Sequence, residues 1–269
     1  MNVEDYRIQP NTKVNLGEWD ASDTGTVPDK ETAQYLLKEN RKKIIDLQER
    51  LYAESAQSML VVFQAMDTGG KDGCIENVFK GVNPTGCRVR SFKVPNDVER
   101  AHDFLWRYHQ HTPRNGILQV FNRSHYEDVL VVRVKDLVPK SIWSKRYDQI
   151  NHFEEVLESN NTRILKFYLH IDKDEQKKRL ESRLDDPAKH WKYSSADLKE
   201  RAYWNDYQEA FEVMLEKCST ATAPWFVVPA NHKWYRDVVV SSAILAALEE
   251  MDPQFPEGDK NLDKVKIPN

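Results

Sequence analysis

Residues 58–73 read S-M-L-V-V-F-Q-A-M-D-T-G-G-K-D-G, an apolar run that leads directly into a glycine-lysine turn. The run Leu60 to Phe63 has the composition of a buried strand. Gly69 and Gly70 can adopt backbone conformations closed to other residues, so that main-chain N–H groups point at an anion. Lys71 adds a positive charge, and residues 71–79 are predicted to form a helix whose N-terminus faces the same anion. The stretch therefore predicts a phosphate-binding loop between a strand and a helix.

The loop departs from the usual pattern G-x-x-x-x-G-K-[ST] at two positions. Ala65 replaces the first glycine, and Asp72 replaces the Ser or Thr that binds the metal. Asp67 lies inside the loop, where a carboxylate would repel phosphates unless a divalent cation lay between them. We therefore interpret Asp67 as a residue that organises magnesium. The alternative is a glycine turn with an exposed lysine, and the loop alone does not decide between the two.

The composition is that of a globular protein with one core. The chain has 269 residues, of which 40% are hydrophobic and 30% charged. We expect a single domain with an insertion. The N-terminus lacks a signal pattern, and no apolar run approaches the roughly 18 residues that would span a membrane. We therefore expect a cytoplasmic protein that has no membrane partner.

Cysteines and net charge exclude several classes of function. Cys74, Cys87 and Cys218 lack the spacing of zinc ligands, and they indicate neither a metal site nor a disulfide framework. A formal net charge of −4 argues against binding to nucleic acid. A local basic patch could still bind an anionic substrate.

Strand and helix patterns alternate along the chain. The N-terminal arm at 1–28 is expected to lie on the body or on a partner subunit. Helical patterns follow at 29–56, 97–111 and 143–158. Further strands are predicted at 87–94, 117–122, 163–171 and 225–228. Such alternation predicts an α/β fold with a parallel sheet covered by helices. Ligands bind at the carboxyl ends of such strands, so the turns after Phe63 and Phe121 are expected to share one site.

The second motif, I-L-Q-V-F-N-R-S-H-Y-E-D at 117–128, is a short strand that ends in ionisable residues. Asn122 stands where many P-loop enzymes place a magnesium-binding Asp. Arg123 could clamp a phosphate with its planar guanidinium. Two acidic residues follow, Glu127 and Asp128. The segment could equally be a helix start capped by Ser124, with the glutamate three residues later completing a capping box, and both interpretations can hold together.

The third feature is a charged helical region at 172–217. Arg179 and Arg183 are four residues apart and lie on one helix face. Arginines of this kind suit a lid that closes over a transferring phosphoryl group. The alternative is a solvated helix face, because acidic residues are interspersed among the basic ones.

Together these three stretches make the sequence resemble the polyphosphate kinase 2 family nearly from end to end. V-V-F-Q-A-M-D-T-G-G-K-D-G resembles the modified Walker A loop of that family, F-N-R-S-H-Y-E-D-V-L resembles its Walker B region in the branch that accepts AMP as well as ADP, and D-K-D-E-Q-K-K-R-L-E-S-R-L-D-D-P-A-K-H-W-K resembles its lid. The resemblance implies a three-layer P-loop kinase fold like thymidylate kinase, with a helical lid at about 173–217. It also implies transfer between inorganic polyphosphate and AMP, ADP or ATP, with Mg²⁺ or Mn²⁺, in a homo-oligomer (dimer or tetramer).

The resemblance also assigns roles to single residues. Those expected to be catalytic are Asp67, Lys71, Arg123, Glu127, Asp128, Arg179 and Arg183, with Asp67 also binding the metal. Those expected to bind phosphate or nucleotide are Thr68, Gly69, Gly70, Lys71, Asp72, Asn122, Lys189 and Lys192. Two other functions stay open at this stage, an ATP-dependent nucleoside monophosphate kinase and a non-catalytic protein that binds polyphosphate.

Overall fold

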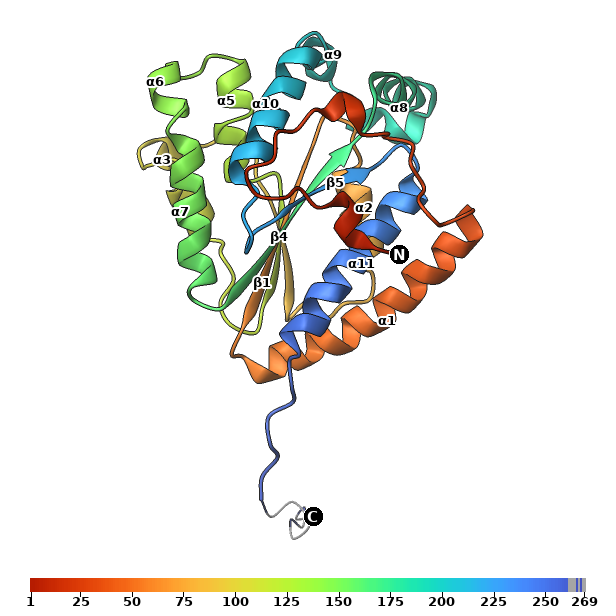
Figure 1. The fold of residues 1–269 in the computed structure, drawn as a ribbon, viewed down its shortest axis with the longest axis vertical. Helices are drawn as coiled ribbons and strands as arrows, with labels where there is room; N and C mark the ends of the chain where they lie inside the picture. The colour runs from red at the N-terminus through yellow and green to blue at the C-terminus, as the bar shows by residue number, and fades with distance from the viewer. Residues whose placement is uncertain (261–264, 266, 268–269) are drawn as a thin grey trace.

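The structure, a computed structural model, describes residues 1–260, 265 and 267, except for the side chains of 192 and 195–197 (Figure 1). Its centre is a sheet of five parallel strands in the order β2-β3-β1-β4-β5. The strands are β1 (Ser58–Ala65), β2 (Cys87–Ser91), β3 (Leu118–Asn122), β4 (Thr162–His170) and β5 (Trp225–Pro229). The predicted parallel sheet is confirmed, and four of its strands lie within one or two residues of the predicted bounds. β2 is shorter than predicted and stops at Ser91.

Helices flank the sheet in two groups and make the fold three-layered, as predicted (Figure 1). One group packs α1 (Lys30–Glu54) and α2 (Lys71–Val78) against α11 (Lys233–Met251). The other group consists of α5 (Val131–Val134), α6 (Lys140–Trp143), α7 (Arg146–Glu158) and α10 (Trp204–Cys218). All eight residues of β1 are buried, because both faces of the central strand are covered.

The remaining helical elements connect these layers. They are α3 (Asp97–Arg100), α4 (Trp106–His109), α8 (Lys173–Asp185), α9 (Ser195–Arg201) and the 3₁₀ turns η1 (Val3–Tyr6), η2 (Leu16–Glu18), η3 (His125–Asp128) and η4 (Pro187–Lys192). The predicted lid region therefore folds as α8, η4, α9 and α10. No described helix combines the length and apolar composition needed to cross a membrane.

The long first helix follows its sequence pattern. Asp29 caps the N-terminus by accepting a hydrogen bond from the Thr32 backbone N–H at 2.8 Å. Ser55 ends the helix in a left-handed conformation. Ala33, Leu37 and Ile44 are buried on one face, as the apolar spacing predicts. The prediction of a helix at 29–56 is thus confirmed to within two residues at each end.

The prediction of a continuous helical stretch at 97–111 is wrong. The chain instead forms the single turns α3 and α4 with a break between them. Asp103 causes the break, because its Oδ1 accepts hydrogen bonds from the backbone N–H groups of Leu105 and Trp106 at 2.9 and 3.1 Å. A short acidic side chain of this kind competes with the helical backbone pattern.

The N-terminal arm lies on the body of the same chain. The Ile8 backbone N–H donates to the Trp225 carbonyl at 2.9 Å, and Arg7 forms an antiparallel bridge with Phe226. Tyr6 donates its hydroxyl to Asp23 at 2.7 Å and contacts the hydroxyl of Tyr235. The arm therefore covers the edge of β5, which is one of the two placements predicted for it.

Candidate phosphate-transfer site

The predicted phosphate loop joins β1 to α2 at the carboxyl end of the sheet. β3 lies beside β1, and Phe63 pairs with Asn122 in the register. The ends of both strands therefore meet at one place, as the two motifs predicted. The Arg123 backbone N–H donates to the Phe63 carbonyl at 3.1 Å, which fixes the turn after β3 against β1.

Two glycines fit the loop for different reasons. Gly70 has a φ of 97°, in the left-handed region that favours glycine, and a Cβ there would overlap Nη1 of Arg236. Gly69 packs so closely that a Cβ would overlap the Ala65 side chain. Ala65, which stands at the position of the usual first glycine, is thus the residue against which Gly69 packs.

Lys71 is the first residue of α2 and lies among charged groups. Its Nζ donates to the Ala65 carbonyl at 3.2 Å. Burial, followed by the nearby Arg123, lowers the pKa of Lys71 to about 8, although Asp67, Glu127 and Asp72 act in the opposite direction. The ammonium group of Lys71 therefore loses its proton at a lower pH than that of an ordinary lysine.

Arg123 links the two predicted motifs. Its Nη2 lies 2.6 Å from Oδ1 of Asp67, and its Nη1 lies 3.2 Å from Oε2 of Glu127. Glu127, opposed by burial and helped by Asp67, raises the pKa of Arg123, so the guanidinium is permanently charged. The same residues line a cavity of about 30 Å³ with Gln176 of α8. The structure thus brings the loop carboxylate, the strand-end arginine and α8 of the predicted lid together.

The other residues of the second motif make separate contacts. Asn122 donates its amide to Oδ1 of Asp72 at 2.5 Å, beside the loop. Ser124 caps η3 as predicted, but the side chain of Glu127 pairs with Arg123 and does not complete a capping box.

Asp128 lies apart from the loop carboxylates. It accepts hydrogen bonds from Arg146 at 2.8 Å and from the Tyr108 hydroxyl at 3.4 Å. Burial raises its pKa to about 6, although Arg146 opposes the shift. Its contacts are those of a residue that anchors η3 to α7, and its catalytic role stays a prediction.

Arg179 is buried under the loop. Its Nη1 donates to the Thr68 carbonyl at 3.1 Å, its Nη2 donates to the carbonyls of Ala230 and Asn231 at 2.5 and 3.2 Å, and its Nε donates to Glu175 at 2.7 Å. In this conformation Arg179 holds the loop to the turn before α11. Its predicted role over the transferring phosphate is untested.

The other lid residues predicted to act on phosphate also lie in α8 and η4. Arg183 is half-buried in α8. Lys189 forms an ion pair with Asp186 at 2.9 Å. The side chain of Lys192 lies outside the described part of the structure. The predicted contacts of these three residues with phosphate therefore stay predictions.

The sequence patterns did not predict a role for Arg236, which holds the phosphate loop by a hydrogen bond to its backbone. Its Nη1 donates to the Gly70 carbonyl at 3.0 Å, and its Nη2 lies 2.6 Å from Oδ1 of Asp237. Oδ2 of Asp237 accepts a hydrogen bond from Asn77 at 2.8 Å, which ties α11 to α2. The sequence did contain a sign of this role, because Arg236 and Asp237 immediately precede the apolar run of α11. Charged residues in such a position are costly unless they are paired.

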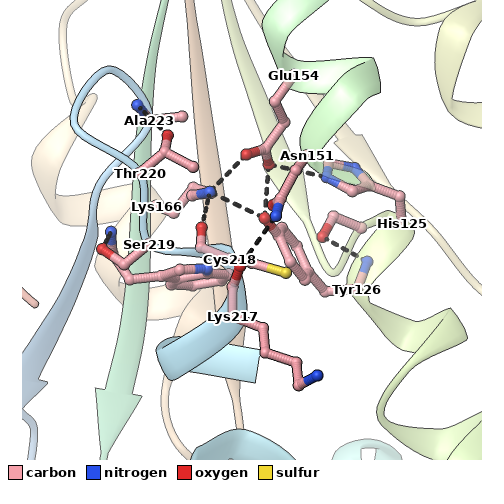
Figure 2. Close-up of polar contacts among 12 residues, drawn as sticks. His125, Tyr126, Asn151, Glu154, Lys166, Lys217, Cys218, Ser219, Thr220 and Ala223 are labelled. Carbon is pink, nitrogen blue, oxygen red and sulfur yellow. Dashed lines mark hydrogen bonds and ion pairs between the residues drawn. The ribbon is translucent and has the colours of Figure 1, made fainter. Parts of the chain in front are cut away.

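A buried polar cluster stabilises the turn that carries Arg123 (Figure 2). Lys166 of β4 donates to Glu154, to the Tyr126 hydroxyl at 2.9 Å and to the Cys218 carbonyl at 2.6 Å. Glu154 also accepts from the Tyr126 hydroxyl at 2.7 Å, and its Oε1 lies 3.1 Å from Nε2 of His125. Burial alone would raise the pKa of Glu154, but Lys166 and His125 outweigh it and lower the pKa. His125 and Tyr126 of η3 are thereby fixed to α7 and β4.

The loop carries two carboxylates that would contribute to a site for a divalent cation such as magnesium. Asp67 and Asp72 supply carboxylate oxygens, the ligand type that Mg²⁺ prefers. Within the described residues no three acidic, His or Cys side chains cluster closely enough to hold a metal. A metal at this site would therefore take most of its ligands from substrate phosphates and water, as Mg²⁺ usually does at phosphoryl-transfer sites.

The chain is similar to known proteins over most of its length. The model of the family "Polyphosphate kinase 2" matches residues 27–256. An AMP/ADP-polyphosphate phosphotransferase of Meiothermus ruber is 50% identical over 98% of this chain and 100% of its own, and an ADP-polyphosphate phosphotransferase of Rhodopseudomonas palustris is 43% identical over 96% and 93%. The crystal structure of polyphosphate kinase 2 from Arthrobacter aurescens superimposes with a TM-score of 0.92 at 43% identity, covering 96% of this chain and 93% of that one. The chain belongs to the polyphosphate kinase 2 family.

Proposed function

We propose that this protein transfers a terminal phosphoryl group between inorganic polyphosphate and AMP or ADP. The observation that carries the proposal is the Asp67–Arg123–Glu127 arrangement beside the Lys71 loop, in a chain similar throughout its length to a protein named for AMP/ADP-polyphosphate transfer. ATP is the donor in the reverse reaction. The three unpaired cysteines are consistent with action in the cytoplasm, and assembly into a homo-oligomer is part of the proposal.

Positioning and charge stabilisation supply the catalysis. A terminal phosphate oxygen of the nucleotide attacks the terminal phosphorus of polyphosphate in line, the bridging P–O bond breaks, and the shortened chain leaves. The loop N–H groups and Lys71 hold the donor, and Arg123 neutralises oxygens on the acceptor side. A bound Mg²⁺ would neutralise phosphate charge next to Asp67. No covalent enzyme intermediate is required.

The direct test mixes the purified protein with Mg²⁺ and polyphosphate, and with either AMP or ADP. We expect ADP and ATP to form from AMP, and ATP from ADP. A parallel reaction with ATP as the only donor to AMP separates this function from that of an ATP-dependent nucleotide kinase. Formation of ADP with ATP but not with polyphosphate would contradict the proposal.

The pKa of Lys71 predicts a pH dependence of the reaction. A lysine is cationic below its pKa, so the free enzyme loses this charge as the pH rises through about 8. We expect kcat/KM for polyphosphate, which reports groups of the free enzyme, to fall about tenfold per pH unit above that point. The fall should be absent from the profile of Lys71→Arg, whatever its absolute rate, because arginine does not titrate there. A fall of the same shape in that variant would assign the titration to another group.

A substitution of Arg183 tests the proposed role of the lid more directly than one of Arg179, because Arg179 also supports the loop. If Arg183 stabilises the charge that develops during transfer, Arg183→Ala should lower kcat by ~10²-fold with little change in KM. Steady-state kinetics with both substrates measure the effect. Lys177→Ala, on the exposed part of the same helix, is the matched control and should retain normal kinetics. A change confined to KM would make Arg183 a docking residue.

A further inference from the structure

Gln176 is buried at the contact between α8 and the phosphate loop. It lies near the start of the helix, and only 1% of its surface is exposed. Its Nε2 donates a hydrogen bond to the backbone carbonyl of Asp67 at 3.1 Å. Its Oε1 accepts a hydrogen bond from Nη1 of Arg201, in α9, at 2.8 Å. One end of the side chain is thus paired with the loop, and the other end is paired with another helix of the predicted lid.

The two partners of Gln176 permit only one orientation of its amide. A backbone carbonyl can only accept a hydrogen bond, and a guanidinium group can only donate one. The amide must therefore turn its nitrogen to Asp67 and its oxygen to Arg201. Nη1 of Arg201 is itself placed by a second hydrogen bond, to the carbonyl of Lys173 at 2.8 Å. It follows that α9 orients the side chain by which α8 holds the loop.

The loop backbone is strained at the residue that follows this contact. Thr68 has a φ of 65°, which lies in the left-handed region. This conformation is unfavourable for a β-branched residue and persists only where the surrounding contacts enforce it. The Gly69 backbone N–H donates to the Met66 carbonyl at 2.9 Å and closes a turn around the strained residue. The turn therefore needs support from outside the loop.

The helix α8 holds the carbonyl groups on both sides of the strained residue. Gln176 donates to the carbonyl of Asp67, and Arg179, about one turn later, donates to the carbonyl of Thr68 at 3.1 Å. With its backbone held in this way, Asp67 directs its carboxylate to Arg123 at 2.6 Å. Arg179 already has a predicted role over the transferring phosphate, whereas no role has been assigned to Gln176.

We propose that Gln176 is a positioning residue for the transfer reaction. Its amide, oriented by Arg201, keeps the loop in the conformation that pairs Asp67 with Arg123. In this role Gln176 touches no reacting atom, and it couples the docking of α8 and α9 to the geometry of the loop. The inference rests on the proposed function, in which this loop binds the phosphates.

Two substitutions separate this role from simple packing. Gln176→Met keeps the length and the apolar contacts of the side chain but removes both hydrogen bonds. Gln176→Glu keeps an acceptor for Arg201, which favours the ionised carboxylate, but an ionised carboxylate cannot donate to the Asp67 carbonyl. In both variants we expect kcat for transfer from polyphosphate to ADP to fall about tenfold, which is equivalent to about 1.4 kcal/mol, with less than about a twofold change in either KM.

Hydrogen exchange of backbone amides measures the loop conformation without any substrate. The amide of Gly69, which closes the turn, should exchange at least about fivefold faster in both variants, while the amides of β1 keep their wild-type rates. The matched control is Gln48→Met, at a position of α1 that is also 1% exposed and where no described residue forms a hydrogen bond with the amide. It should change neither the kinetics nor the exchange of the loop.

Normal kcat and normal exchange of the loop in Gln176→Met would overturn the inference. Normal values in Gln176→Glu alone would overturn it by showing that only the contact with Arg201 matters. A fall in kcat without faster exchange at Gly69 would also contradict it. Wild-type protein that transfers nothing from polyphosphate would overturn the proposed function instead, and the exchange measurement would still decide whether Gln176 holds the loop.

Discussion

Asp67→Asn should lower kcat/KM for transfer from polyphosphate to ADP by ~10³-fold while leaving the fold intact. The substitution keeps the shape of the side chain but removes the charge that faces Arg123 at 2.6 Å. It also removes the carboxylate that we propose binds the metal. Because Asp67 is partly exposed, the loss of its charge should change the midpoint of thermal unfolding little.

Two roles of Asp67 can be separated by titrating Mg²⁺. If Asp67 binds the metal, the Mg²⁺ concentration for half-maximal activity should rise at least tenfold in Asp67→Asn. If Asp67 only orients Arg123, that concentration should stay at the wild-type value while kcat falls. Asp46→Asn, on the exposed side of α1, is the matched control. Near-normal turnover of Asp67→Asn with Mg²⁺ would contradict both roles.

Lys166→Met should have the largest effect on stability. Lys166 is fully buried, and its ammonium group is shared among Glu154, Tyr126 and a backbone carbonyl. Removing it leaves the carboxylate of Glu154 buried without its strongest partner. Breaking a buried pair in this way costs about 3–5 kcal/mol of unfolding free energy. Urea unfolding followed by fluorescence measures this loss of unfolding free energy. In a thermal melt, the same loss should lower the midpoint of unfolding by about 5–15 °C for a domain of this size.

The double variant Lys166→Met/Glu154→Gln completes the test. It removes both charges, so it should regain at least about 2 kcal/mol relative to Lys166→Met alone. Glu49→Gln, at an exposed acidic position of α1, provides a control for the loss of a carboxylate elsewhere. Equal stabilities of the single and the double variant would show that the ion pair contributes little and that packing around Lys166 dominates.

Local signals explain why most of the fold could be predicted. Buried strands such as β1 are short apolar runs, and the helix α1 has a cap, an apolar face and a left-handed end within its own sequence. The glycines of the loop are needed by the backbone conformation and close packing of the loop itself. The failure at 97–111 has a local cause as well, because Asp103 uses its side chain to interrupt the helix.

The sequence by itself determined the parallel α/β fold and the predicted phosphate loop, because each depends on residues close together in the chain. It also determined that Arg123 lies beside the loop, because a parallel sheet brings the ends of its strands to one edge. Only the tertiary structure decided that Arg179 and Arg236 support the loop, that Lys166 pairs with Glu154, and that Gln176 contacts the loop. These contacts join segments separated by up to 166 positions, such as Gly70 and Arg236. A charged residue in an apolar segment shows that a partner is needed, but which residue supplies it is set by packing between distant elements.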